Sequence, residues 1–175
     1  MIPVAILGFG VLALGCYYAY FAFREGRQLR PWSALVAGIQ PLDMPQMERL
    51  AMSYLNPGKD QLGIEPAEMW ALIGGYEGLN RMRGNAEAML ELARHVQRWN
   101  PTEGRVVAEM MRRDAVRLRT ATRKIEMATL TQRYAALAPF SVQEASAAYY
   151  LMRQRLLALY ESNHAGLRPQ LASVL

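Results

Sequence analysis

The stretch from Leu79 to Val96, LNRMRGNAEAMLELARHV, decides the fold of this chain. Its apolar residues recur at alternating steps of three and four, the spacing that gathers them on one face of a helix. A second stripe with the same spacing runs from Val107 to Ala128, interrupted by Asp114. We predict that the two stripes, on residues 72–96 and 107–132, pack antiparallel around a shared core.

The chain on either side of these stripes also predicts helices. Many alanines, eleven methionines and few β-branched residues favour helix over sheet. A short helix is expected from Met44 to Leu55, capped by Asp43, and a later one begins at the cap Asn100 or Thr102 and runs to about Ala135. Ser141-Val-Gln-Glu144 is a capping box that opens the last helix. The predicted fold class is all-α, with about three long helices and one short helix in an antiparallel bundle.

Four glycines complicate the segment from Glu65 to Trp99. Gly74, Gly75, Gly78 and Gly84 each weaken a helix by ~1 kcal/mol relative to alanine. Either they face a close neighbour, or the segment divides near Gly84-Asn85 into a hairpin.

The hairpin alternative carries a family resemblance. Ala67-Glu68-Met69-Trp70 with Ile73-Gly74 resembles the opening of a tetratricopeptide repeat, and Gly84-Asn85 with Asn100-Pro101 resembles its second half. No second copy follows. The resemblance implies a helical groove that captures a peptide of a soluble partner.

Residues Ile2 to Phe23 are uncharged and mostly apolar. A helix of this length is ~33 Å long, enough to cross a bilayer, and we predict a single transmembrane anchor. Gly15 and Ala19 form a small-residue pair on which another membrane helix can pack. Aromatic and basic residues are expected to anchor the predicted span at the membrane interface. The basic residues place the N-terminus outside and the C-terminal domain in the cytoplasm, so we predict a protein of the bacterial inner membrane. These interface residues are Tyr17, Tyr18, Tyr20, Trp32, Arg24, Arg27 and Arg30.

Three other interpretations of this segment fit the sequence less well. A cleaved signal peptide needs basic residues before the apolar run and a small-residue site after it, and neither is present. A lipoprotein signal ending at Cys16 fits poorly, because the chain stays apolar after the cysteine. Gly8 and Gly10 match a dinucleotide fingerprint, but no second strand with an acidic end follows.

The predicted domain organisation places the anchor at 1–24, a proline-broken connector at 25–45, the bundle at 46–168 and an apolar tail at 169–175. Within the connector, Trp32 to Ile39 is apolar but too short to span a membrane. It is expected either to lie at the headgroups or to be buried against the domain.

No residues in the sequence specify a reaction. His95 and His164 stand outside any ligand or catalytic pattern, and Cys16 lies in the predicted span. We therefore expect no enzyme activity, no catalytic residues, no cofactor and no metal. A net charge of +5 without interleaved aromatic residues also argues against a nucleic-acid partner.

A basic helix face is the strongest surface signal. Arg112, Arg113, Arg117 and Arg119 lie on the side of the predicted helix opposite its apolar stripe. This face is expected to attract anionic lipid headgroups or an acidic partner, or else to be a solvated face with pairs such as Glu109-Arg113. The expected function is that of a non-catalytic accessory or scaffold subunit that contacts other membrane protein subunits. The alternative is a membrane-tethered adaptor.

Overall fold

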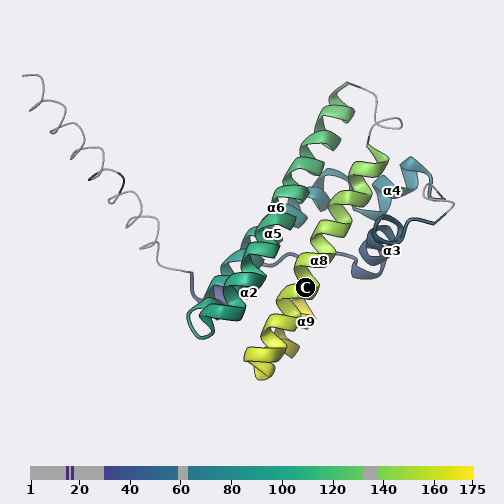
Figure 1. The fold of residues 1–175 in the computed structure, drawn as a ribbon. Coiled ribbons are helices and arrows are strands. Elements are labelled where there is room, and N and C mark those ends of the chain that lie inside the picture. The colour runs from purple at the N-terminus through teal and green to yellow at the C-terminus, as the bar shows by residue number, and fades with distance from the viewer. Residues whose placement is uncertain (1–14, 16, 18–29, 59–62, 132–137) are drawn as a thin grey trace, which may run out of the picture. The chain divides into compact units, whose positions relative to one another are not determined.

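The computed structural model describes residues 15, 17, 30–58, 63–131 and 138–175. The chain divides into two compact units, Met1–Arg30 and Pro31–Leu175. In the described residues every regular element is a helix, and no strand occurs (Figure 1). The predicted all-α class and the helical bundle are confirmed.

The described elements of the second unit are all helical. Their bounds are α2 Trp32–Ala37, α3 Met44–Leu55, α4 Pro66–Leu72, α5 Gly75–Gln97, α6 Pro101–Leu130, α8 Pro139–Asn163, the 3₁₀ turn η1 Ala165–Leu167 and α9 Arg168–Val174.

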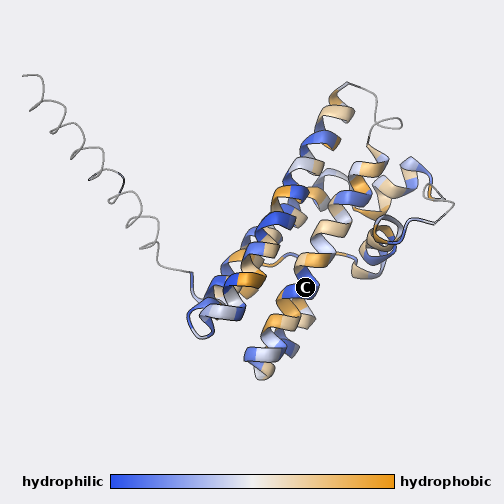
Figure 2. Cartoon of the chain, viewed as in Figure 1, coloured by the Kyte–Doolittle hydropathy of each residue, from blue (hydrophilic) through white to orange (hydrophobic). Residues whose placement is uncertain are grey.

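Three long helices, α5, α6 and α8, form the bundle, and α3 packs on α8 from its other flank (Figure 1). The two predicted stripes meet in the core. In α5 every residue of the first stripe is buried, and in α6 the second is buried except for the half-buried Val107. Figure 2 shows the outcome along α6, where hydrophilic residues predominate on the side away from its neighbours.

Glycine geometry divides the segment from Glu65 to Trp99 at Ile73-Gly74. Gly74 and Gly75 have positive φ angles of 75° and 61°, a left-handed conformation that glycine adopts without strain. Gly78 packs against the preceding turn so closely that a Cβ there would lie 1.5 Å from the Ile73 carbonyl oxygen. The glycines thus build an elbow between α4 and α5.

The division near Gly84-Asn85 that we considered is wrong, because α5 continues unbroken through both residues. Asn85 is buried, and its side chain pairs with the backbone of Gln40: Asn85 Nδ2 donates to the Gln40 carbonyl at 2.7 Å and Asn85 Oδ1 accepts from the Gln40 amide at 2.8 Å. Because its side-chain amide is hydrogen-bonded, the polar Asn85 can be buried on α5. The second half of the tetratricopeptide resemblance therefore has no counterpart in the fold.

The described part of the connector packs against the bundle. Leu35 and Ile39 are buried, and the half-buried Trp32 donates from Nε1 to the Tyr160 hydroxyl at 3.1 Å. That hydroxyl in turn donates to the carbonyl of Leu92 at 3.2 Å. Of the two alternatives for Trp32–Ile39, the structure shows burial against the domain.

The helix ends agree with the sequence in two cases and differ in one. Asp43 caps α3 by accepting from the Gln46 amide at 3.2 Å, and Asn100 caps α6 by accepting from the Glu103 amide at 3.2 Å. The predicted capping box at Ser141 is wrong, because α8 begins earlier, at Pro139, and Ser141 is buried within it. The apolar tail forms α9, whose Leu171 is buried together with Leu175.

Within the part of the chain that the structure describes, no helix has the length and apolar character needed to cross a membrane. The predicted span falls outside the described residues apart from Gly15 and Tyr17, both of which have helical backbone.

Candidate functional site

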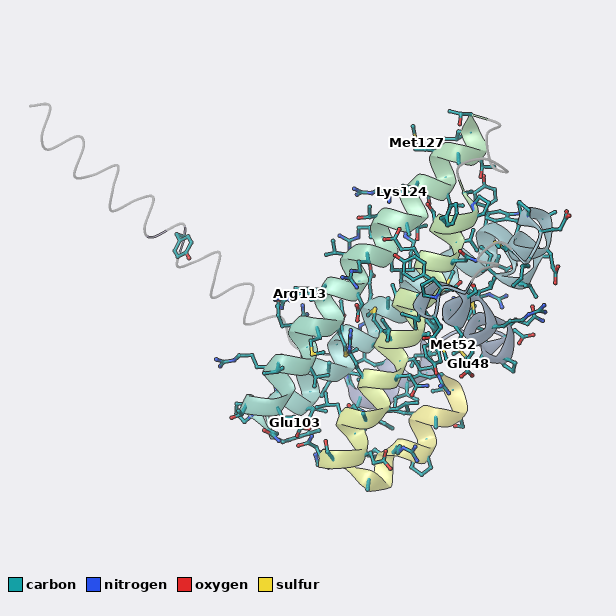
Figure 3. All side chains as sticks on the ribbon, turned by 45° about the vertical axis from the view of Figure 1, so that its right-hand side comes forward. Glu48, Met52, Glu103, Arg113, Lys124 and Met127 are labelled. Atoms are coloured by element: carbon teal, nitrogen blue, oxygen red, sulfur yellow. The ribbon has the colours of Figure 1, made fainter. Side chains whose placement is uncertain are left out.

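The outer side of α6 carries many exposed basic side chains. Each of the four predicted arginines, Arg112, Arg113, Arg117 and Arg119, is exposed there. They belong to a larger set of seven exposed cations, together with Arg105, Arg123 and Lys124. Figure 3 shows Arg113, Lys124 and Met127 pointing away from the bundle along α6. The amphipathic register of α6 puts all seven on the side opposite its buried stripe.

Apolar side chains are interspersed with these cations. Val106 and Met110 lie near the start of α6, Val116 in its middle, and Met127 and Leu130 near its end; Leu130 is 77% exposed. We call these five residues and the seven cations the basic face. No aromatic residue occurs in α6.

Carboxylates lie within 4 Å of four of the seven cations, Arg112, Arg113, Arg117 and Lys124, the last of which pairs at 3.6 Å with Glu144 of α8. Glu109 pairs with Arg112 at 2.8 Å and with Arg113 at 3.7 Å, whereas Glu126 pairs at 3.0 Å with Arg83 of α5. Glu103 lies in the first turn of α6, where it accepts hydrogen bonds from Ser162 and Asn163. Exposed pairs of this kind contribute well under 1 kcal/mol each.

The fourth acidic residue of α6 lies beneath the basic face. Asp114, which interrupts the apolar stripe, is only 2% exposed and forms an ion pair with Arg155 of α8. Burial lowers the pKa of Arg155. Since Asp114 is enclosed between α6 and α8, its charge links the two helices, and Arg117 of the basic face lies 3.9 Å from the same carboxylate.

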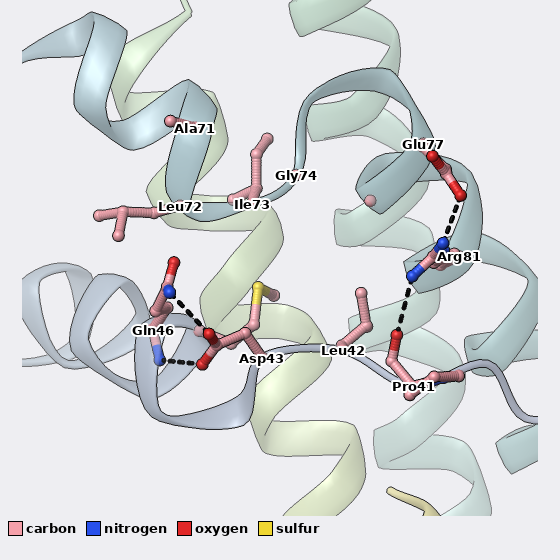
Figure 4. Close-up of a pocket in the computed structure, with 12 residues that line it drawn as sticks. Pro41, Leu42, Asp43, Gln46, Ala71, Leu72, Ile73, Gly74, Glu77 and Arg81 are labelled. Atoms are coloured by element: carbon pink, nitrogen blue, oxygen red, sulfur yellow. Dashed lines mark hydrogen bonds and ion pairs between the residues drawn. The ribbon is translucent and has the colours of Figure 1, made fainter.

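A pocket of about 310 Å³ lies on the other flank of α8, between the start of α3, the elbow and the first turns of α5 (Figure 4). Met47 and Ile73 are buried at its wall, with the half-buried Leu42 and Leu72 beside them. This volume is at the lower end of the range for small-ligand sites, and the lining combines apolar groups with a few polar ones, as such sites do.

Polar side chains around the pocket are held in place by one another. Arg81 forms an ion pair with Glu77 and donates to the Pro41 carbonyl at 3.3 Å, as Figure 4 shows. Asp43 accepts from the Gln46 amide and from its side chain. The pocket therefore has a fixed polar rim.

Charge on this flank has the opposite sign to that of the basic face. The described residues from Pro31 to Arg81 include five exposed acidic side chains and two basic ones, the exposed Arg49 and the half-buried Arg81 of the pocket lining. The acidic residues are Asp43, Glu48, Glu65, Glu68 and Glu77. We call this surface, with its pocket, the acidic side.

Other candidate residues have simpler surroundings. His164 stacks edge-on against Trp99 with ring centroids 4.3 Å apart, and His95 lies in the last turn of α5. Buried tyrosines of the core stay protonated: burial raises the pKa of Tyr160 to about 12 although the Trp32 hydrogen bond lowers it, and burial also raises the pKa of Tyr149. No group of metal-ligating side chains occurs within the described ranges.

The structure describes only some of the predicted anchor residues. Tyr17 is 62% exposed, Gly15 has open space around its Cα, and Arg30 is exposed. Ala19, Tyr18, Tyr20, Arg24 and Arg27 lie outside the described residues. The membrane-packing and interface roles of these residues stay predictions.

Comparison with known proteins supplies no further assignment. No family model matches the chain, and neither a curated protein nor a solved structure does.

Proposed function

We propose that this protein is a non-catalytic, single-pass accessory or scaffold subunit of a membrane complex. Residues 1–24 act as the anchor, and the helical unit holds a neighbouring protein subunit through the pocket of the acidic side. The pocket is the observation that carries the proposal, because its apolar wall and fixed polar rim suit an inserted side chain of a partner.

Charge selects the kind of partner segment. Asp43 and Glu77 are exposed at the pocket, and Glu48, Glu65 and Glu68 surround it at longer range. We expect this surface to attract a partner segment in which a basic residue stands next to an apolar one. Complementary charge speeds the encounter with such a segment and disfavours acidic competitors.

A membrane-tethered adaptor for a soluble partner is the second candidate. The pocket suits it equally, because about 310 Å³ accommodates one or two side chains of a peptide. It needs no tetratricopeptide repeat, since the start of α3, the elbow and the first turns of α5 together build the pocket.

Purification of the full chain separates the two candidates. The C-terminally tagged protein is extracted from native membranes in mild detergent, and the size and composition of the material that co-purifies are measured. A membrane complex of defined composition supports the subunit; a soluble partner bound to a single tethered chain supports the adaptor. Recovery in the soluble fraction without detergent would contradict both.

A substitution pair tests the pocket. Ala71→Arg places a long cation at an exposed position of the pocket lining and should remove the co-purifying partner. Ala158→Arg makes the same change at an exposed position of α8 outside the lining and should leave the partner bound. Equal retention of the partner by both variants would move the interface away from the pocket.

A further inference from the structure

We infer that the basic face of α6 binds the anionic headgroups of the bilayer. The inference rests on the proposed function, because the anchor is what keeps the helical unit near lipid. It adds an orientation: the basic face lies against the membrane, and the acidic side with its pocket is turned away from it.

The distribution of charge on α6 favours lipid over a protein. The seven cations are spread along α6, a helix ~45 Å long, and do not form a compact cluster. A fluid layer of anionic headgroups can neutralise dispersed charges in any arrangement, whereas a protein partner needs acidic residues in matching register.

The apolar residues of the basic face suit shallow contact with lipid. Val116, Met127 and Leu130 are exposed and set among cations whose long stems can reach back to the headgroup level.

Because the two flanks of α8 carry opposite charges, one orientation of the helical unit at an anionic membrane is favoured over the others. An anionic surface attracts the basic face and repels the five carboxylates of the acidic side. Figures 1 and 3 both show α6 and α3 on different flanks of α8. Headgroup binding through α6 therefore leaves the pocket accessible to a partner from the aqueous side.

The test uses the full chain with Cys16→Ser and one new cysteine carrying a fluorescent label. Thr120→Cys places the label at an exposed position of α6 between Val116 and Lys124, and Ala67→Cys places it at an exposed position of α4 as the matched control. Both proteins are reconstituted into vesicles of phosphatidylcholine alone or of phosphatidylcholine mixed with phosphatidylglycerol, with a quencher on the headgroups.

We expect the Thr120→Cys label to be quenched several-fold more in the phosphatidylglycerol vesicles than in the neutral ones, and the Ala67→Cys label to be quenched equally in both. High salt, or reversal of Arg112, Arg113 and Arg117 to glutamate, should abolish the difference, because each weakens attraction to anionic headgroups.

Two outcomes would overturn the inference. Equal quenching of the Thr120→Cys label in both vesicles would show that the face does not bind anionic lipid. Equal quenching, together with a protein that co-purifies with the unaltered chain but not with the chain in which Arg112, Arg113 and Arg117 are reversed to glutamate, would assign the face to an acidic protein. Failure of the chain to enter vesicles at all is a different result, since it contradicts the anchor of the proposed function.

Discussion

Gly78 and Gly84 lie less than two turns apart in α5, yet their surroundings are opposite. A Cβ on Gly78 would meet the Ile73 carbonyl oxygen at 1.5 Å, whereas a Cβ on Gly84 would have no atom outside the local helix within 4 Å. The first glycine is required by the elbow that shapes the pocket, and the second is only a weak point in an exposed helix surface. The same residue type thus carries a tertiary constraint at one position and none at the other.

The largest expected effect is that of Gly78→Ala. The added methyl group has no space unless the backbone of the elbow moves, so we expect the free energy of unfolding to fall by more than about 3 kcal/mol. Urea unfolding of the full chain in detergent measures it. A loss below ~1 kcal/mol would show that the elbow adjusts freely and would remove the contrast between the two glycines.

Removal of Asp114 tests whether a polar residue inside an apolar stripe is also held by tertiary contact. Asp114→Ala leaves Arg155 partly buried without its ion-pair partner, and we expect a loss of about 3 kcal/mol in the free energy of unfolding. Arg117→Ala is the control: Arg117 lies 3.9 Å from the same carboxylate but is exposed, so its loss should stay within ~0.5 kcal/mol. Equal effects would mean that burial of the pair is unimportant.

Asn85 extends the comparison to the residue beside Gly84. Asn85→Ala leaves the amide and carbonyl of Gln40 without their partners, and we expect a loss of about 2 kcal/mol. Asn80→Ala, at an exposed position of the same helix, should change stability by less than ~0.5 kcal/mol. Native-state hydrogen exchange at the Gln40 amide checks the mechanism, since protection there should disappear with Asn85.

The smallest effect has the opposite sign. Gly84→Ala should raise the free energy of unfolding by about 0.5–1 kcal/mol, because alanine is the better helix former and has room at this position. The denaturation midpoint of the full chain in detergent measures the gain. A loss of stability would indicate that Gly84 meets a neighbour that the fold of this chain alone does not contain, such as a bound partner.

Hydrophobic periodicity predicted the fold class and the two stripes of the bundle, because those apolar residues are buried by the next helix along the chain. It could not place the division between α4 and α5, since four glycines look alike until the backbone of Ile73 is known to lie against one of them. The hairpin at Gly84-Asn85 stayed an open alternative for the same reason: the partner of Asn85, Gln40, is distant in sequence.

The candidate sites were predictable to different degrees. The arginines of the basic face follow from helical spacing alone, and all four predicted ones are exposed. The pocket of the acidic side was missed, because its lining comes from three separate segments brought together by the elbow. Asp114 and Asn85, polar residues within or beside apolar stripes, were the available signal for buried tertiary pairs.

The way the connector is fastened determines how the helical unit would respond to mechanical tension. The hydrogen bonds from Trp32 to Tyr160, between Gln40 and Asn85, and from Arg81 to Pro41 follow one another along the chain from Pro31. A force applied at Pro31 therefore acts first on the hydrogen bond between Trp32 and Tyr160 and only afterwards on the hydrogen bonds between Gln40 and Asn85. The connector would detach stepwise and lengthen under load, so that a pull on the chain dissipates before it reaches α3 and the core.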